Sequence, residues 1–450
     1  MEFDSINHIS SRSEFVNEDI NDHSSVNSEQ PSRIFYPKTH EECQQLVIWA
    51  NQTNASLFTR GAGTGTTGGA ICTKGDQIGI SLVHMNNILD LDQINATITV
   101  EPGVILSRIH QAVEAVGLFY PPDPASLNRC TIGGNVAENA GGPRALKYGV
   151  TKDYVIGLKG VWANGESFEY GGKLKKNVAG YDLIGLLTGS EGTLAVITEI
   201  TLKLRPKPTV IAEAIAGYKS TEDALIALTN TLTRGVLPST AEFMVERCMS
   251  ASLAYSNEAP VMASFPAYVI WQVDGQTVED VNKQLNQIKS FSKGATFLMM
   301  DTDDLSNRVW GLRRNVSLGL KQVAKKKYSE DIVVPIGNVP EVIKRLETLN
   351  HPSGIEVLGY GHLGDGNIHV NILKMSASED DWERFSPDVI EQVMAIALEY
   401  GGSISGEHGI GITKKQFMPL MFSNHDLHIM KQIKTIVDPL GILNPGKLHP

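Results

Sequence analysis

The 450-residue sequence lacks the features that define several common protein classes. Its four cysteines are far apart and form no CxxC pair, which excludes an iron–sulfur or zinc-finger signature and suits a reducing compartment. The formal net charge is −11, and no Lys/Arg-rich stripe offsets it, so a nucleic-acid partner is not expected. The basic triplet Lys325 to Lys327 is better interpreted as a solvated helix end.

Long apolar runs and a basic N-terminus are also missing. No run of about 18 uncharged apolar residues occurs, so we expect no membrane-spanning segment. The first 30 residues contain seven acidic residues and one arginine, which excludes a secretory signal and argues against a mitochondrial transit peptide. We therefore expect a cytoplasmic protein, and we leave open a peripheral attachment to the inner face of a membrane.

Glycine, by contrast, is concentrated in one stretch, residues 131–155, with the sequence TIGGNVAENAGGPRALKYGVTKDYV. Neither a helical nor a strand period runs through it. Glycine at this density lets the backbone approach a neighbour closely or adopt left-handed dihedrals. A polyphosphate or a flat ring system needs such a wall of bare amides and small side chains. A mobile glycine-rich loop is the alternative, but apolar strands follow directly at 155–158 and 161–163. The stretch is therefore predicted to line a large ligand.

A second glycine cluster, RGAGTGTTGGA, occupies residues 60–70. Gly63, Gly65 and Gly68 match GxGxxG, the pattern of a Rossmann dinucleotide site. A Rossmann loop opens a helix, however, and the residues that follow, 75–82, have the pattern of a turn and a strand. We therefore predict a nest of backbone amides that holds phosphate without the Rossmann helix, and keep the Rossmann site as the alternative.

The rest of the chain divides at Pro206-Lys207-Pro208, a proline pair that marks a domain boundary. Before it, Thr39-His-Glu-Glu42 is a capping box that begins a helix. After it, strands and helices alternate, which indicates an α/β or α+β sandwich domain. In this second half, helices are expected at 221–233, 277–290, 304–324, 340–349 and 425–437, and strands at 211–216, 268–273, 296–300 and 332–336.

Several segments together resemble the FAD-binding oxidoreductases of the vanillyl-alcohol-oxidase / PCMH superfamily, and within it the glycolate oxidase flavoprotein subunits and D-lactate dehydrogenases. The likeness covers roughly residues 33–450, in the order of that family. The matching segments are RGAGTGTTGGA (60–70), PPDPAS (121–126), TIGGNVAENAGGPRALKYGVTKDYV (131–155), KNVAGYDL (176–183), LLTGSEGTLAVITE (186–199), GYGHLGDGNIHVNI (359–372), SGEHGIG (405–411) and ILNPGKL (442–448).

The resemblance implies an α+β fold, with a two-part PCMH-type FAD-binding domain and a C-terminal α/β cap domain that has a ferredoxin-like core. We expect residues 1–32 to be a flexible lead-in and 33–207 the FAD-binding domain. Residues 208–424 would be the substrate or cap domain with a metal site. The helix and tail at 425–450 would return to the FAD-binding domain. In this family FAD lies between the two domains.

The resemblance also implies which residues hold FAD. The first glycine nest would hold the pyrophosphate, Gly192 and Ile197 would lie near the adenine, and Asn444 would reach back from the tail. Members with covalent flavin have a histidine where this chain has Thr64, so we expect non-covalent FAD. The pyrophosphate residues are Arg60, Gly61, Ala62, Gly63, Thr64, Gly65 and Thr66. The flavin and ribityl residues are Pro122, Ser126, Gly133, Gly134, Asn135, Ala137, Asn139, Gly141 and Gly142.

Two histidine motifs near the C-terminus predict a divalent-metal site. His362 and His369 flank a Gly-Asp-Gly-Asn turn that lets both imidazoles face one point, and Glu407-His408 lies in another glycine-bounded turn. Two neutral imidazoles and the Glu407 carboxylate are a ligand set with open positions for substrate. Zinc is the first choice, and manganese or iron would also accept these ligands. The alternative is that these are hydrogen-bonded turn residues.

This constellation fits the oxidation of a D-2-hydroxy acid. Such an acid chelates a metal through its carboxylate and hydroxyl groups, and the metal lowers the pKa of the hydroxyl. His408 would take the hydroxyl proton as general base, and hydride would pass from C2 to flavin N5. Arg313 is the candidate clamp for the substrate carboxylate, although an isolated arginine could equally be a surface residue. Asn371 is expected to contact the substrate or a ligand.

The substrate is expected to be D-lactate or glycolate. In the D-2-hydroxyglutarate branch, a lysine shortly before a strand that ends in proline holds the second carboxylate, and the matching position here is Ser329. Lys325 to Lys327 could substitute, so a D-2-hydroxyglutarate dehydrogenase stays open. An alcohol or aldonolactone oxidase and an electron-transfer subunit of a larger glycolate oxidase-type complex are further alternatives. A quinone or a protein would accept the electrons, and any iron–sulfur partner would be a separate chain.

Overall fold

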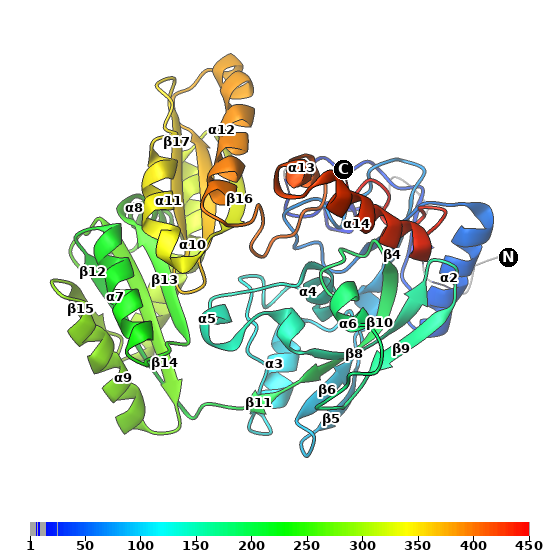
Figure 1. The fold of residues 1–450 in the computed structure, drawn as a ribbon, viewed down its shortest axis with the longest axis horizontal. Helices are drawn as coiled ribbons and strands as arrows, with labels where there is room; N and C mark the ends of the chain where they lie inside the picture. Colours follow the sequence, from blue (N-terminus) through cyan, green and yellow to red (C-terminus); the bar gives the residue numbers. More distant parts are fainter. Residues whose placement is uncertain (1–5, 7, 10–14, 25, 450) are drawn as a thin grey trace. The chain divides into compact units, whose positions relative to one another are not determined.

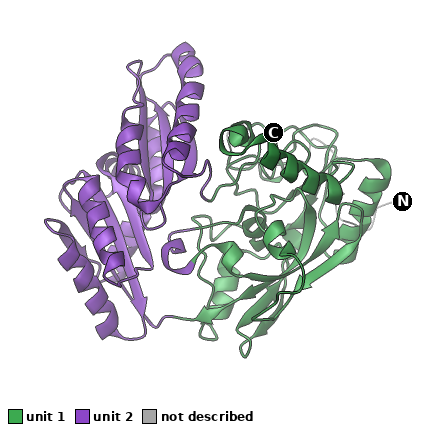
Figure 2. Cartoon of the chain, viewed as in Figure 1, with its two compact units in different colours: residues 1–141, 149–207, 407–450 green, residues 142–148, 208–406 purple. Residues whose placement is uncertain are grey.

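The computed structural model describes residues 6, 8–9, 15–24 and 26–449, which form two compact units (Figures 1 and 2). Unit 1 comprises residues 1–141, 149–207 and 407–450, and unit 2 comprises 142–148 and 208–406. The division after Lys207 lies at the proline pair. The chain re-enters unit 1 at Glu407, whereas the sequence placed this return at 425.

Unit 1 contains a small, mainly parallel sheet with the order β1-β2-β4-β3. Helix α2 (His40–Thr53) has Thr39 as its N-cap, whose side chain accepts a hydrogen bond from the Glu42 N–H. The Glu42 carboxylate accepts from the Lys38 N–H at 2.6 Å, so only the first half of the expected capping box forms. The apolar face of α2 packs into the core next to this sheet. The strands are β1 (His8–Ile9), β2 (Arg33–Phe35), β3 (Leu57–Arg60) and β4 (Ile78–Ser81).

The described part of the N-terminal 32 residues differs from the flexible lead-in expected from the sequence. Strand β1 pairs with β2, and Ile6 and Ile20 are buried. The His23 N–H also donates to the Gly65 carbonyl at 2.8 Å. The polar composition of the lead-in conceals the two isolated apolar residues, Ile6 and Ile20, that are buried. The prediction for residues 1–5, 7, 10–14 and 25 lies outside the described residues.

A second, antiparallel sheet of unit 1 has the order β5-β6-β10-β8-β9 and buries one face under helices α3 and α4. Helix α4 lies inside the glycine-rich stretch, for which the sequence predicted no regular period. The strands are β5 (Ile88–Asp92), β6 (Thr97–Val100), β8 (Val155–Trp162), β9 (Ser167–Gly171) and β10 (Ala195–Lys203), with a separate pair β7 (Leu118–Phe119) and β11 (Arg205–Pro206). The remaining helices are α1 (Asn17–Ile20), α3 (Leu106–Glu114), α4 (Ile132–Glu138), α6 (Leu183–Leu187), α13 (Met418–Met421) and α14 (Asn424–Val437).

Unit 2 is built on one seven-stranded antiparallel sheet, in the order β15-β12-β14-β13-β17-β18-β16. The first four strands, with α7 and α9 as connections, have the 4-1-3-2 order of a ferredoxin-like fold, as the resemblance implies. β17 and β18 form a hairpin, β16 pairs with β18, and β13 pairs with β17, which joins the two parts. The strands are β12 (Val210–Tyr218), β13 (Thr240–Val245), β14 (Ala267–Gly275), β15 (Thr296–Met299), β16 (Lys326–Val333), β17 (Ile355–His362) and β18 (Asn367–Lys374).

Helices cover both faces of this sheet (Figure 1). Helices α8 and α10 pack against each other over one hydrophobic core, which includes Cys248, Leu312 and Tyr360. Helices α7, α9, α11 and α12 contact one another in the other layer. The bounds are α5 (Ala145–Tyr148), α7 (Thr221–Thr233), α8 (Glu246–Ser256), α9 (Val278–Phe291), α10 (Asp303–Val323), α11 (Val339–Glu347) and α12 (Glu379–Glu399).

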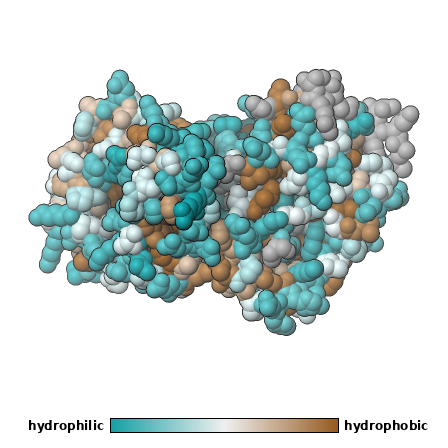
Figure 3. All heavy atoms as spheres, turned by 90° about the horizontal axis from the view of Figure 1, so that it is seen from above, coloured by the Kyte–Doolittle hydropathy of each residue, from teal (hydrophilic) through white to brown (hydrophobic). Residues whose placement is uncertain are grey.

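The surface is mostly hydrophilic on the face drawn in Figure 3, with hydrophobic residues scattered among polar ones. Exposed apolar side chains such as Ile94, Val178 and Ile436 come from different elements. Among the described residues, no helix is both long enough and apolar enough to cross a membrane.

Candidate functional site

The glycine loop 61–70 presents free backbone donors. The N–H groups of Gly63 to Thr66 donate to no other described residue. A Cβ atom built at Gly65 would have no atom within 4 Å, so this side of the loop is open. Gly61 is glycine for another reason, because a Cβ there would lie 2.2 Å from Thr131 Oγ1. Consecutive unpaired amides next to open space fit the pyrophosphate of FAD.

Arg60 differs from its neighbours in this loop. Its guanidinium group is buried and donates to the carbonyls of Glu18 at 2.6 Å, Asn21 at 3.2 Å and Ala70 at 3.4 Å. Burial lowers the pKa of the guanidinium group. The Arg60 side chain therefore ties the lead-in to the glycine loop, and only its backbone is left to take part in cofactor binding.

The glycine-rich stretch contains helix α4 of unit 1. Thr131 caps this helix by accepting from the Gly134 N–H at 3.4 Å. Several of its glycines are explained by protein packing: a Cβ at Gly133 would lie 2.6 Å from Pro102 Cβ, and one at Gly141 would lie 2.8 Å from Glu407 Oε2. The remaining predicted flavin residues before Gly142 belong to the same unit, at Pro122, Ser126, Asn135, Ala137 and Asn139.

Gly142 is the one predicted flavin residue that belongs to unit 2. It opens the short segment 142–148, which contains α5. Lys147 forms an ion pair with Asp274, and the Tyr148 hydroxyl donates to Asp274 Oδ2 at 2.9 Å. This anchoring to β14 explains why the segment groups with the second unit, which the sequence did not predict.

The C-terminal tail returns to the small sheet of unit 1, as the resemblance implies. The Asn444 N–H donates to the Leu57 carbonyl at 2.8 Å, and Asn444 Nδ2 donates to the Glu191 carbonyl at 3.0 Å. A Cβ at Gly192 would lie 2.7 Å from Asn444 Nδ2, so the tail packs directly on this turn. Ile197 follows on β10, at a bulge in the pairing with β8.

In unit 2, a buried carboxylate that the sequence did not reveal joins two predicted site residues. Glu242 on β13 accepts from His362 Nδ1 and pairs with Arg313 Nη2 at 2.5 Å. Burial alone would raise the pKa of Glu242, but the attraction of Arg313, His362 and His369 outweighs it and holds the pKa below the usual value. Because Nδ1 faces Glu242, this carboxylate fixes the orientation of the His362 ring.

Arg313 is not a surface arginine. Its side chain is only 12% exposed, and its guanidinium carbon lies 4.9 Å from the Tyr360 ring centroid. The Nε atom is buried without a hydrogen-bond partner among the described residues. One edge of the guanidinium is thus engaged with Glu242, and a donor remains for an acceptor such as a carboxylate.

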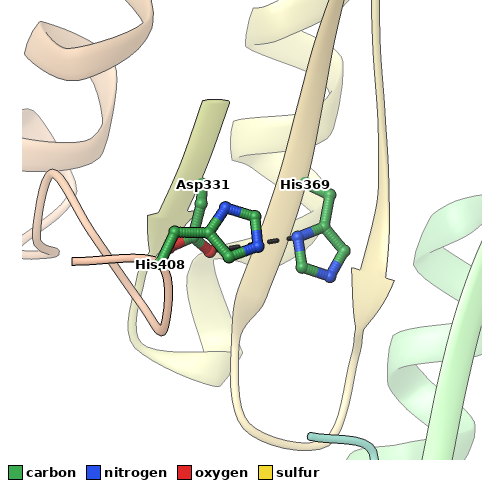
Figure 4. Close-up of side chains that lie close together, drawn as sticks. All are labelled: Asp331, His369 and His408. Carbon is green, nitrogen blue, oxygen red and sulfur yellow. Dashed lines mark ion pairs between the residues drawn. The ribbon is translucent and has the colours of Figure 1, made fainter. Parts of the chain in front are cut away.

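His369 lies next to His362, with ring centroids 5.1 Å apart. The Gly-Asp-Gly-Asn turn makes the β17–β18 hairpin that brings the two rings together, as predicted. A second carboxylate missed in the sequence, Asp331 on β16, approaches His369 Nδ1 at 3.9 Å (Figure 4). Asp331 is fully buried and also accepts from Asn367 Nδ2 at 2.5 Å and from the Gly406 N–H at 2.9 Å.

Asn371 on β18 contacts two polar side chains of the neighbouring strand β16, Lys327 and Ser329. Its Oδ1 accepts from Lys327 Nζ at 3.2 Å and from Ser329 Oγ at 3.2 Å. Lys327 Nζ also donates to Ser317 Oγ at 2.6 Å, and no carboxylate of the described residues lies within 4 Å of it. Burial lowers the pKa of Lys327 to about 8. Strand periodicity explains why Lys327, Ser329 and Asp331 share one face.

Glu407 and His408 belong to unit 1, and His408 is also drawn in Figure 4. They follow Gly406 directly in the chain, and Gly406 is the residue that donates to Asp331. Both side chains are partly exposed, and Glu407 Oε1 lies 3.8 Å from His408 Nε2. Glu407 and His408 therefore directly follow a glycine whose backbone is hydrogen bonded to Asp331.

Comparisons with known proteins identify the family of the chain. Residues 207–448 match the family of FAD linked oxidases, C-terminal domain, and residues 31–171 match an FAD binding domain. Glycolate oxidase subunit GlcD of Bacillus subtilis is 35% identical over 421 residues, which are 93% of this chain and 89% of that protein. D-2-hydroxyglutarate dehydrogenase of Stutzerimonas stutzeri is 32% identical over 426 residues, which are 93% of this chain and 91% of that protein.

The chain is also similar to a third curated relative and to a solved structure. D-lactate dehydrogenase of Anaerostipes hadrus is 32% identical over 427 residues, which are 93% of this chain and 90% of that protein. The crystal structure of p-cresol methylhydroxylase with substrate bound superposes with a TM-score of 0.77 at 16% identity, over 98% of this chain and 93% of that chain. At this identity the second likeness shows the shared fold alone.

Proposed function

Because the chain belongs to the FAD-linked oxidases, we propose that it oxidises a D-2-hydroxy acid to the 2-oxo acid. The relatives named for glycolate, D-lactate and D-2-hydroxyglutarate all support this class of substrate. The observation that carries the proposal is the row of paired groups in unit 2. Glu242 binds both His362 and Arg313, and Asp331 lies beside His369. These residues can hold a metal and a carboxylate side by side.

Non-covalent FAD would supply the hydride acceptor, flavin N5. In this chain, the free amides of Gly63 to Thr66 would bind the pyrophosphate. The glycine-rich stretch and the Gly192 turn would line the rest of the cofactor. The closely packed tail at Asn444 would hold that turn in place. Thr64 leaves no imidazole in the loop for a covalent link to the flavin.

A divalent metal, zinc before manganese or iron, would be held by His362, His369 and Glu407. It would polarise the substrate hydroxyl. Support comes from the carboxylate partner of His362, because Glu242 on Nδ1 orients that ring and raises the basicity of Nε2. Glu407 would be the third ligand, because it directly follows Gly406, whose N–H donates to Asp331.

His408 would take the proton of the substrate hydroxyl as general base, and Arg313 would bind the C1 carboxylate through its unpaired Nε and neighbouring N–H groups. Asn371 would orient the substrate through its amide. Electrons would leave to a quinone or a protein. An iron–sulfur centre would have to come from another chain, because the four cysteines here are buried and separate.

Lys327 favours a second candidate substrate, a 2-hydroxy dicarboxylate such as D-2-hydroxyglutarate. The sequence argued for a monocarboxylate because Ser329 stands where a lysine was expected. In the structure, Lys327 lies two residues earlier on the same face, bound to Asn371 and Ser317 and without a carboxylate partner. A partly buried ammonium group without a counter-charge is suited to a distal carboxylate of the substrate.

Anaerobic flavin reduction tests both candidates. The FAD-loaded protein is mixed with D-lactate, L-lactate, glycolate or D-2-hydroxyglutarate, with and without prior chelation, and the flavin absorbance is followed. Bleaching by a D-2-hydroxy acid that is lost on chelation supports the function and the metal. Faster bleaching by D-2-hydroxyglutarate that Lys327→Met abolishes selects the dicarboxylate. No bleaching by any of these acids would contradict the proposed function.

A further inference from the structure

The loop that carries Glu407 and His408 is held by a carboxylate of unit 1 with no role assigned so far. Glu191 Oε1 accepts from the Ile410 N–H at 2.8 Å, and Glu191 Oε2 accepts from the Gly411 N–H at 2.7 Å. A carboxylate that receives two successive backbone N–H groups fixes both the position and the tilt of that backbone. The nearer of these groups lies two residues after His408.

Glu191 is itself held firmly. It lies in the turn between α6 and β10, is 5% exposed, and its N–H donates to the Ala137 carbonyl at 2.8 Å. Its φ of 52° lies in the left-handed region, which is unfavourable for a residue other than glycine. The surrounding structure thus maintains an unfavourable backbone conformation that directs this carboxylate at the loop.

Thr67 holds the same loop from the glycine cluster. Its hydroxyl donates to the His408 carbonyl at 3.3 Å, and its own carbonyl accepts from the Ile412 N–H at 2.8 Å. Thr67 is 2% exposed and directly follows the free amides of Gly63 to Thr66. The segment proposed to bind the pyrophosphate and the segment that carries His408 are therefore hydrogen bonded to each other.

The backbone conformation of residues 409–411 is restricted by close neighbours. Gly409 has a φ of 82°, and a Cβ there would lie 2.2 Å from Glu138 Oε2. Gly411 has a φ of 52°, and a Cβ there would lie 2.2 Å from the Thr67 carbonyl oxygen. Both glycines pack against groups of unit 1. The backbone after His408 is thus clamped from two sides.

We propose that Glu191 is a positioning residue for the oxidation step, and that Thr67 couples the position of His408 to the segment that binds FAD. The inference rests on the proposed function, because it assigns these residues to the placing of the general base. Neither side chain touches the substrate. Both act on the peptide groups that flank His408, so their loss changes the rate of proton and hydride transfer more than substrate binding.

The test uses Glu191→Gln and Thr67→Val, with Glu199→Gln as a matched control. Gln has the size of Glu but offers one oxygen, so it can accept from only one of the two N–H groups. Val has the shape of Thr without the hydroxyl. Glu199 is a partly buried glutamate on β10 of the same unit, and no hydrogen bond of its side chain is found among the described residues. Each protein is loaded with FAD and compared at equal flavin content.

Single-turnover flavin reduction is measured over a range of substrate concentrations. We expect Glu191→Gln to lower the limiting rate by 10- to 100-fold and Thr67→Val by 3- to 10-fold, with the substrate dissociation constant changed by less than threefold. The double variant loses less than the product of the two factors, because both changes release the same loop. The Glu199→Gln rate stays within twofold of the wild type.

A limiting rate within twofold of the wild type in Glu191→Gln would overturn the inference, and so would a loss confined to substrate affinity. If Glu191→Gln does not fold, Thr67→Val decides by the same criterion. Failure of the proposed function is distinct, because then the wild-type flavin itself is not reduced by any 2-hydroxy acid.

Discussion

Replacement of Glu242 by glutamine tests the paired groups of unit 2 most sharply. The wild-type carboxylate is fully buried and serves two partners, His362 through Oε1 and Arg313 through Oε2. Glutamine keeps the volume but offers one acceptor oxygen and no charge. It can therefore satisfy only one of the two donors, and the Arg313 guanidinium is left buried without its counter-ion.

The size of the effect follows from these contacts. Removal of one partner from a buried ion pair costs about 3–5 kcal/mol, and the remaining amide oxygen recovers part of this. We expect Glu242→Gln to lose about 2–3 kcal/mol, which corresponds to a drop in Tm of about 5–10 °C for a unit of this size. Since the carboxylate also orients His362, metal affinity should fall about 10- to 100-fold.

Glu213→Gln is the matched control. Glu213 is a glutamate on β12 of the same unit, and it accepts from Trp310 Nε1 at 2.8 Å and Gln272 Nε2 at 2.6 Å. It touches the same helix as Arg313 but contacts no predicted ligand. Thermal unfolding, metal content after dialysis and flavin reduction per bound FAD are compared. Glu242 does not have the proposed role if Glu242→Gln keeps wild-type metal content and rate, or if Glu213→Gln loses them equally.

Three further predictions address charge and backbone. Lys447 is buried with its pKa lowered to about 7 from 10.5, so between these values the unfolded chain binds more protons. The stability of the wild type relative to Lys447→Met should therefore rise by about 1.4 kcal/mol per pH unit in that window and stay constant below it, as urea unfolding at several pH values can show. Lys327 is charged mainly below its pKa of about 8. The KM for a dicarboxylate should thus rise above pH 8 while the KM for D-lactate follows a flatter course, and equal profiles would argue against contact with Lys327. Gly65→Ala should leave the Tm of the FAD-free protein unchanged but weaken FAD binding at least tenfold in a fluorescence titration. Gly61→Ala should lower the Tm of the FAD-free protein itself, because its Cβ would meet Thr131.

The domain boundary and much of the fold could be predicted from local patterns. Helix α7 has the expected bounds, α9 and α10 are each shifted by one residue, and α14 begins one residue earlier than expected. Helix α12 was missed because Pro387 interrupts its pattern, although Ser378 and the acidic first turn are a regular helix start. Strand β13 was also missed, although it carries Glu242. Propensity does not distinguish a short, fully buried strand from its neighbours.

The proximity of His362 and His369 could be predicted from the sequence, but the contact of His362 with Glu242 could not. His362 and His369 are recognisable because one tight turn separates them. Glu242 lies 120 positions from His362, and only the pairing of β13 with β17 brings them together. Asp331 did have a signal in the sequence. A strand period of two places Asp331 on the same face as Lys327 and Ser329. This period would have predicted that Lys327, as well as Ser329, faces the candidate site.

The glycines show a similar limit. The sequence attributed their density to a ligand, yet Gly61, Gly133 and Gly141 are required by neighbouring protein atoms. Only positions such as Gly65 have open space beside them. The glycine density therefore predicted correctly that other atoms lie close to the backbone here. Whether those atoms belong to the protein or to a ligand depends on the tertiary structure.

In the proposed reaction, a D-2-hydroxy acid gives up its C2 hydrogen to FAD. The most direct measurement is the rate of anaerobic flavin bleaching with D-lactate or D-2-hydroxyglutarate, compared with the same acid deuterated at C2. We predict bleaching with formation of one 2-oxo acid per flavin, slowed severalfold by deuterium. Flavin that is bound at full occupancy but stays oxidised with each of these acids would rule out the proposed oxidation.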